Sequence, residues 1–163
     1  MVEAPRLKMS NLSPEAYQHL MQLETLIARH VEPTLYHLIK MRASQINGCA
    51  FCLHMHTDQA LRHGETPQRL TALDAWEESP LFSDKERAAL AWTEEVTLIA
   101  DSGASKPAFD ALKAHFSDEG IGWLVLAVVQ INSWNRLAIS TRSQYDPKMF
   151  GQQAQAEKTP EPA

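Results

Sequence analysis

The chain has 163 residues, of which 44% are hydrophobic and 21% are charged. This length and composition fit one globular domain with a hydrophobic core of its own and leave little room for a second. Lys and Arg number 15 against 20 Asp and Glu, which gives a net charge of -5. Because no basic run interrupts this acidic balance, nucleic acid is not expected as a partner.

The first nine residues carry Pro5 and several charges, and they lack the apolar stretch of a signal peptide. The longest apolar run, residues 121–129, is far shorter than the roughly 20 residues of a membrane span. We therefore expect a cytoplasmic protein without a membrane partner. A permanent structural disulfide is unusual in that compartment, so its two cysteines need another explanation.

Helix start and stop signals predict three segments in the first part of the chain, near residues 13–30, 33–47 and 49–63. Ser13 precedes a proline and suits the N-cap of the first segment. Pro14 and Pro33 stand where a first helical residue is expected. Gly64 follows the third segment, where a left-handed C-cap favours glycine.

Four further helices are predicted near residues 66–76, 83–99, 106–115 and 117–139. Ser83 and Glu86 form a capping-box pattern at the start of one of them. No segment alternates as a strand bounded by hairpin turns does. We expect a compact all-α domain of six to seven helices over residues 1–150. Residues 151–163 are rich in Gln, Glu, Pro and Ala, and we expect them to be disordered.

Cys49, Cys52 and His56 occupy positions i, i+3 and i+7 of the third segment. At about 100° per residue these three side chains share one helix face, whereas His54 points elsewhere. The Asn-Gly turn before Cys49 places both cysteines in the first helical turn. Unpaired N–H groups and the positive end of the helix dipole favour a thiolate there.

This constellation suits the reduction of peroxides. A thiolate attacks the O–O bond, becomes a sulfenic acid and condenses with a neighbouring thiol to a disulfide. His56 lies one turn beyond Cys52, where its imidazole can accept or donate a proton. We therefore expect Cys49 and Cys52 to interconvert between a dithiol and a disulfide.

Two other interpretations of the cysteine pair remain open. Free cysteines are often small buried hydrophobes, and a CxxC motif can be half of a zinc site. Zinc requires four ligands, and this chain has no third cysteine. Farther along, Trp134-Asn135-Arg136 could line a pocket, but a tryptophan at helical spacing is more often part of the core.

The residues around the cysteines, LIKMRASQINGCAFCLHMH at positions 38–56, resemble the alkylhydroperoxidase core of the AhpD-like, carboxymuconolactone decarboxylase superfamily. Residues 83–91 and 131–139 also resemble this family, so the resemblance covers roughly residues 35–142. It implies an all-helical fold assembled as a homotrimer or homohexamer. It also implies reduction of a hydroperoxide substrate with electrons from a thiol reductant protein or a dithiol, without a metal or haem cofactor.

The resemblance implies a catalytic role for each of four residues. Cys52 matches the cysteine that attacks the peroxide, Cys49 its resolving partner and His56 the proton-relay histidine. The glutamate of the family falls on His37, so an imidazole replaces a carboxylate there. The decarboxylase branch of the superfamily lacks the cysteine pair, and its lactone chemistry is therefore not the expected activity.

Two functions follow from this site. The first is a thiol-dependent peroxidase, and the second is a non-enzymatic redox sensor or interaction protein that uses the same dithiol. If His37 lies near His56, each imidazole should lower the pKa of the other. We then expect a peroxidase rate that rises between about pH 6 and 8 as the imidazoles lose protons. Glu32 is another acid that could serve the proton relay.

Overall fold

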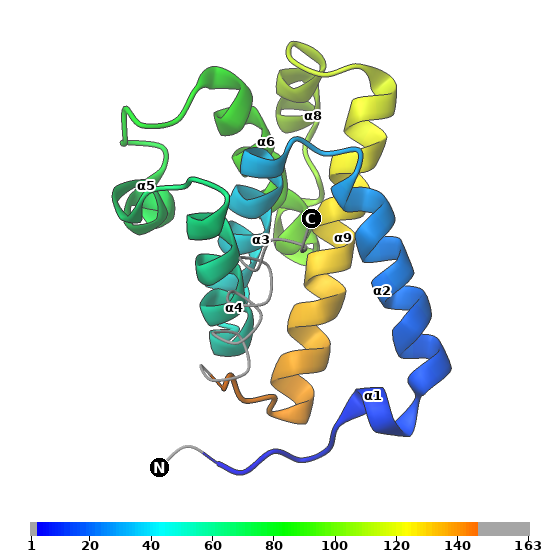
Figure 1. The fold of residues 1–163 in the computed structure, drawn as a ribbon. Coiled ribbons are helices and arrows are strands. Elements are labelled where there is room, and N and C mark those ends of the chain that lie inside the picture. The colour runs from blue at the N-terminus through cyan, green and yellow to red at the C-terminus, as the bar shows by residue number, and fades with distance from the viewer. Residues whose placement is uncertain (1–2, 147–163) are drawn as a thin grey trace, which may run out of the picture.

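The computed structural model describes residues 3–146 of the chain (Figure 1). The tail expected to be disordered, residues 151–163, lies outside this range. Within the described residues every regular element is a helix and no strand occurs, so the all-α prediction is confirmed. The elements are α1 (Met9–Leu12), α2 (Pro14–Ala28), α3 (Pro33–Asn47), α4 (Ala50–Arg62), α5 (Pro67–Ala72), the 3₁₀ helix η1 (Leu73–Ala75), α6 (Asp84–Thr97), α7 (Ile99–Ser102), α8 (Lys106–Lys113) and α9 (Asp118–Thr141).

All seven predicted helices are present, and the single-turn helices α1 and α7 are additional. The segment predicted to run to residue 99 breaks at Leu98, whose backbone (φ -101, ψ 34) leaves the helical region. The hydroxyl of Ser102 donates to the carbonyl oxygens of Glu95 (2.6 Å) and Leu98 (3.1 Å). The backbone N–H groups of Asp101 and Ser102 also donate to the Leu98 carbonyl, so these bonds stabilise the turn at which α6 ends.

Six of the seven predicted helices begin with a side-chain cap, supplied by Glu32, Cys49, Thr66, Ser83, Ser105 and Ser117. The Glu32 carboxylate accepts hydrogen bonds from the backbone N–H groups of Thr34 (3.0 Å) and Leu35 (2.8 Å) at the start of α3. Ser83 and Glu86 form the predicted capping box of α6. Ser13 is the N-cap of α2, but its hydroxyl makes no capping bond. Glu32 is thus engaged in capping α3.

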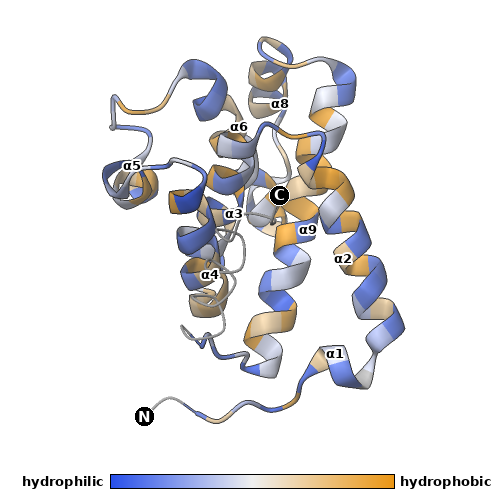
Figure 2. Ribbon diagram, in the orientation of Figure 1, coloured by the Kyte–Doolittle hydropathy of each residue, from blue (hydrophilic) through white to orange (hydrophobic). Residues whose placement is uncertain are grey.

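Helix α3 lies at the centre of the fold and packs against α4, α6 and α9, while α2 packs against α9 (Figure 1). One hydrophobic cluster joins α2, α3, α6, α8 and α9, and a second joins α3 to α4, α5 and α6. Hydrophobic residues concentrate in the part of α9 that runs beside α2 (Figure 2). None of the helices within residues 3–146 has the length and apolarity needed to cross a bilayer.

The central helix buries polar side chains as well as apolar ones. His37, Lys40 and Ser44 are at most 7% exposed and recur at positions i, i+3 and i+7 of α3. Side chains with this spacing share one helix face. Burying such groups is unfavourable unless they find partners, and those partners lie in the candidate site.

Candidate active site

A tight turn joins α3 to α4 and brings the cysteines to the end of the central helix. Gly48 adopts a left-handed conformation (φ +67), which glycine tolerates without strain. Its N–H donates to the carbonyl of Gln45, and the N–H of Cys49 donates to the carbonyl of Ser44 at 3.0 Å. These bonds end α3 and let α4 begin at once. The two helices therefore form a hairpin, with the cysteines at its closed end.

Cys49 is the N-cap residue of α4, and Cys52 lies in its first turn. The backbone N–H of Cys52 donates to the Cys49 sulfur at 3.4 Å. Both cysteines are free thiols and only 1% exposed. The predicted location in the first helical turn is confirmed, with the sulfur of Cys49 itself serving as the cap.

The two thiols differ in acidity. A hydrogen bond from the Cys52 thiol, together with the Cys52 backbone N–H and Asn135, lowers the pKa of Cys49 to about 7 although burial opposes this. Donating to Cys49 raises the pKa of Cys52 above its ordinary value, and burial adds to the effect. Near neutral pH the pair therefore holds its negative charge on Cys49 and its proton on Cys52.

His56 is 2% exposed, and burial and the charge of Lys40 lower its pKa to about 3. Its imidazole is therefore neutral at pH 7. Nδ1 lies 2.9 Å from Oε1 of Gln59, an oxygen that can only accept, so Nδ1 carries the proton. Nε2 then presents a lone pair and has no hydrogen-bond partner among the described residues. This nitrogen is available as a base.

His37 lies on α3, with its ring centroid 4.7 Å from that of the exposed His63. Burial, His63 and Lys40 lower the pKa of His37 to about 4, and its charge would lower that of His56. The two imidazoles are thus within electrostatic reach, as the sequence suggests. Both are already neutral at pH 6, so the expectation that they cause a rate increase between pH 6 and 8 is wrong. The group that titrates in that interval is Cys49.

An ion pair within electrostatic reach of Cys52 is not predicted by the sequence. Lys40 on α3 pairs with Glu24 on α2, and the two side chains are 6% and 15% exposed. The carboxylate of Glu24 also accepts hydrogen bonds from the Tyr36 hydroxyl (2.7 Å) and the indole N–H of Trp134 (3.0 Å). Only the spacing of Lys40 after His37 was visible in the sequence, because the other partners come from different helices.

Asn135 on α9 lies in the segment Trp134-Asn135-Arg136, which the sequence marks as a possible pocket lining but for which its helical spacing favours the core. It is fully buried and donates to the hydroxyl of Ser44 at 3.0 Å. Its carbonyl oxygen accepts from the Asn47 amide at 2.9 Å. Hydrogen bonds from Asn135 also lower the pKa of both Cys49 and Cys52. Asn135 therefore ties α9 to the dithiol.

His54 points away from the cysteines, as the helical spacing predicts. It is exposed, and its ring meets that of Tyr145 edge-on at 5.0 Å. Among the described residues, no group of three or more His, Cys, Asp or Glu side chains is arranged to hold a metal ion. The site therefore consists of two thiols, two neutral imidazoles, one ion pair and one amide.

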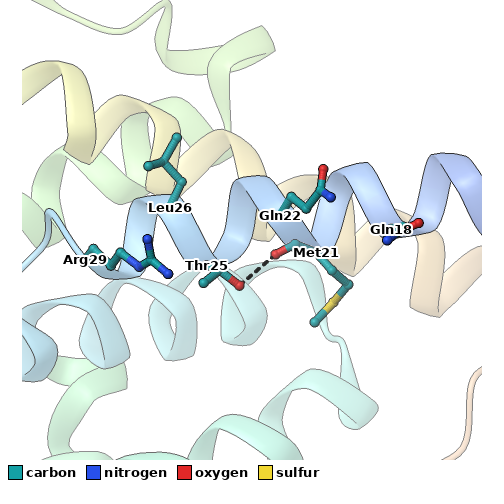
Figure 3. A pocket seen from close by; sticks show the side chains of 6 residues that line it. All are labelled: Gln18, Met21, Gln22, Thr25, Leu26 and Arg29. Atoms are coloured by element: carbon teal, nitrogen blue, oxygen red, sulfur yellow. Dashed lines mark hydrogen bonds between the residues drawn. The ribbon is translucent and has the colours of Figure 1, made fainter.

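A surface hollow lies away from the cysteines. It has a volume of about 470 Å³ and follows the outer face of α2, where the six lining side chains are arranged along the helix (Figure 3). Its lining residues are Gln18, Met21, Gln22, Thr25, Leu26 and Arg29. None of these belongs to the dithiol site. The cysteines instead form a buried cluster with Ala138, and Phe51 packs against this cluster.

Comparison with known proteins assigns this architecture to a family. The model of the carboxymuconolactone decarboxylase family matches residues 14–95, which include α2, α3, α4 and α6 up to residue 95. The chain belongs to the carboxymuconolactone decarboxylase family. The resemblance inferred from the cysteine motif is thereby confirmed.

A relative from Bacillus subtilis, the uncharacterized protein YdfG, is 39% identical over 136 residues, covering 83% of this chain and 92% of its own. A protein of unknown function from Agrobacterium tumefaciens, described as a candidate AhpD antioxidant defence protein, is 43% identical. Its structure matches with a TM-score of 0.85 over 88% of this chain and 99% of its own. These relatives support the AhpD-like form of the family fold.

More distant structures share the fold alone. The debrominase Bmp8 is 23% identical, with a TM-score of 0.72 over 84% of this chain and 74% of its own. An alkylhydroperoxidase AhpD core protein from Ralstonia eutropha is 16% identical, with a TM-score of 0.75 over 87% and 76%. The same helical arrangement thus occurs in proteins described by different chemistries, and the function of this chain must be argued from its own site.

Proposed function

We propose that this protein is a thiol-dependent peroxidase that reduces small hydroperoxides through a dithiol/disulfide cycle of Cys49 and Cys52. The proposal rests on one observation: Cys49 and Cys52 share a single proton near neutral pH, and the neutral imidazole of His56 is available as a base. Cys49 holds a thiolate near pH 7, Cys52 donates to it, and Nε2 of His56 presents a lone pair. Nucleophile, resolving thiol and proton carrier are thus adjacent.

In the proposed first step, the proton of Cys52 moves to Cys49 and leaves a thiolate on Cys52. This sulfur attacks the terminal oxygen of the hydroperoxide, the O–O bond breaks, and the sulfur loses two electrons. The alkoxide that leaves takes the proton back from Cys49 and departs as an alcohol. Cys52 is now a sulfenic acid, and Cys49 is again a thiolate.

In the second step, the Cys49 thiolate attacks the sulfenic sulfur of Cys52. The S–S bond forms, the S–O bond breaks, and hydroxide leaves as water after taking a proton delivered through His56. His37 interacts electrostatically with His56, and its ring contacts that of the exposed His63, so we assign His37 to this proton path. The sum converts a dithiol and a hydroperoxide into a disulfide, an alcohol and water.

A thiol reductant protein or a small dithiol closes the cycle by thiol–disulfide exchange. The low pKa of Cys49 makes it the better leaving group of the pair. Attack by the reductant on Cys52 would therefore release Cys49 as a thiolate, and a second attack would free Cys52. We further propose that this occurs in the cytoplasm, where thiol reductants are abundant.

The alternative is a redox sensor whose dithiol is oxidised once and then only reports that state. Peroxide consumption with dithiothreitol as reductant separates the two functions. We expect many equivalents of cumene hydroperoxide to be consumed per subunit, and none above background by Cys52→Ser. Consumption that stops after one equivalent, with reductant still present, would favour the sensor.

A further inference from the structure

The hairpin of α3 and α4 aligns two rows of polar side chains. At its closed end the carbonyl of Ser44 accepts from the N–H of Cys49 at 3.0 Å. Toward its open end the rings of His37 and His63 lie 4.7 Å apart. Lys40 lies between Ser44 and His37 on the same buried face of α3. Lys40 therefore lies one helical turn from Ser44, whose carbonyl binds Cys49, and within electrostatic reach of Cys52 and His56.

Lys40 is 5% exposed, so its ammonium has almost no contact with water. A buried ammonium is unfavourable unless an opposite charge and hydrogen bonds compensate it. Here the ammonium pairs with Glu24 and lies 4.1 Å from the centroid of the Tyr36 ring. Burial lowers the pKa of Lys40, and the negative charge of Glu24 opposes this. Lys40 therefore depends on Glu24 to remain charged.

Glu24 is held in place from three helices. Besides Lys40, it accepts from Tyr36 on α3 and from Trp134 on α9, and its own backbone belongs to α2. Burial acts to raise the pKa of Glu24, but Lys40 and these donors lower it overall. A carboxylate fixed so firmly keeps the ammonium of Lys40 at one position relative to the sulfurs.

We propose that the Lys40–Glu24 ion pair controls the charge of the dithiol, with Lys40 stabilising negative charge on Cys52 and Glu24 keeping Lys40 charged. The inference deepens the proposed function, because it names the groups that let the less acidic thiol become the nucleophile. Lys40 lowers the pKa of Cys52, and Cys52 in turn raises that of Lys40. The pKa of Cys49 is set by hydrogen bonds and burial instead.

Other groups around Cys52 contribute less directly. From α9 come only neutral groups, the Trp134 indole and the Asn135 amide. The charged or titratable side chains in the site are Glu24 of α2, Tyr36, His37 and Lys40 of α3, Cys49 at the start of α4 and His56 within it. Both histidines are neutral above pH 5 because burial lowers their pKa to about 3 and about 4. At neutral pH the only fixed positive charge in this group is therefore Lys40.

The test measures thiolate formation on each sulfur separately. In Cys49→Ser, the pH dependence of alkylation by iodoacetamide reports Cys52 alone. Adding Lys40→Met should raise the pH midpoint of Cys52 alkylation by about one unit or more, which is the range for loss of a neighbouring opposite charge. In Cys52→Ser, which reports Cys49, the same Lys40→Met should leave the midpoint nearly unchanged. Equal shifts on both sulfurs, or no shift on Cys52, would overturn the proposal.

The role of Glu24 is tested in the same Cys49→Ser background. Glu24→Gln should raise the midpoint of Cys52 as Lys40→Met does, because an unpaired buried ammonium gives up its proton. The double variant E24Q/K40M should shift the midpoint no further than either single variant. A lower midpoint in Glu24→Gln would show that Glu24 only opposes Lys40, and would contradict the proposal.

Breaking a buried pair by removing one partner is destabilising, so Lys40→Met could fail to fold. The double variant E24Q/K40M leaves no uncompensated charge and provides the same measurement. Neither experiment needs peroxide. If the shift occurs but the unmodified protein consumes no hydroperoxide, the proposed function fails and the electrostatic role stands. If hydroperoxide is consumed without such a shift, the inference about Lys40 and Glu24 fails.

Discussion

The sulfur of Cys49 accepts a hydrogen bond from the backbone N–H of Cys52 at 3.4 Å, so the side chain of one redox cysteine caps the helix that carries the other. The Cys52 thiol donates to the same sulfur. Two donors from one residue therefore stabilise the thiolate of its partner. This relationship makes the acidity of Cys49 depend on the presence and redox state of Cys52.

The first prediction concerns pH. Because the pKa of Cys49 is lowered from 9.0 to about 7, its thiolate is populated as the pH rises through 7 and is lost below it. Peroxide reduction should accordingly rise between about pH 6 and 8 and then level off. Thiolate absorbance at 240 nm should rise over the same interval in the reduced protein. In Cys52→Ala the midpoint should move up toward 9, since the side-chain donor is gone; a midpoint that stays near 7 would contradict this account.

The second prediction separates the roles of the cysteines. Cys49→Ser should react once with hydroperoxide and leave a sulfenic acid on Cys52, which dimedone traps and mass spectrometry locates. Cys52→Ser should show little trapping at matched pH, although its remaining thiol is the one at the helix N-terminus. Efficient trapping on Cys49 would reverse the assigned order while keeping the pair as the redox centre.

The third prediction concerns His56. Replacing it with Gln should lower the rate of peroxide reduction about a hundredfold, within the range for loss of a general acid–base group. The matched control is His54→Gln, because His54 lies on the same helix but is exposed and turned away from the sulfurs. Equal rates in both variants would remove His56 from the mechanism.

The fourth prediction concerns Asn135. Asn135→Ala should reduce the free energy of unfolding by about 1–3 kcal/mol, because the half-buried Asn47 amide and the buried Ser44 hydroxyl each lose a partner. It should also raise the pKa of Cys49, since Asn135 helps to lower it. Urea unfolding and alkylation against pH measure the two effects. Ser140→Ala, at an exposed position of the same helix, should change neither.

The fifth prediction is a homotrimer or homohexamer built by one domain over residues 1–150. Exposed apolar side chains occur on both α2 and α9, which pack together: Met21, Leu26, Leu126 and Val129 are 40–49% exposed. Light scattering should give three or six times the chain mass of 18.3 kDa. Val129→Glu should reduce that mass, whereas Ile99→Glu, at an equally exposed apolar residue on α7, should not. A mass of 18.3 kDa for the unmodified protein would exclude assembly.

The sequence by itself determined the helices and the dithiol motif, because both depend on local signals. Prolines, capping residues and Gly48 act on the backbone within one turn, and helical periodicity alone places Cys49, Cys52 and His56 on one face. The same periodicity correctly predicts that His54 points away from the site. The main error in the predicted helix boundaries is at Leu98, where α6 ends although the sequence predicts a helix to residue 99.

Only the tertiary structure decided the electrostatics of the site. Periodicity indicates that a face of α2 or α9 is buried, but not which helix covers it, so the positions of Glu24 and Asn135 beside the dithiol could not be predicted. The helix dipole acts on both cysteines alike and does not reveal which becomes the thiolate. That difference arises from the direction of one hydrogen bond, from burial and from Lys40, which act only once α2, α3, α4 and α9 have packed together.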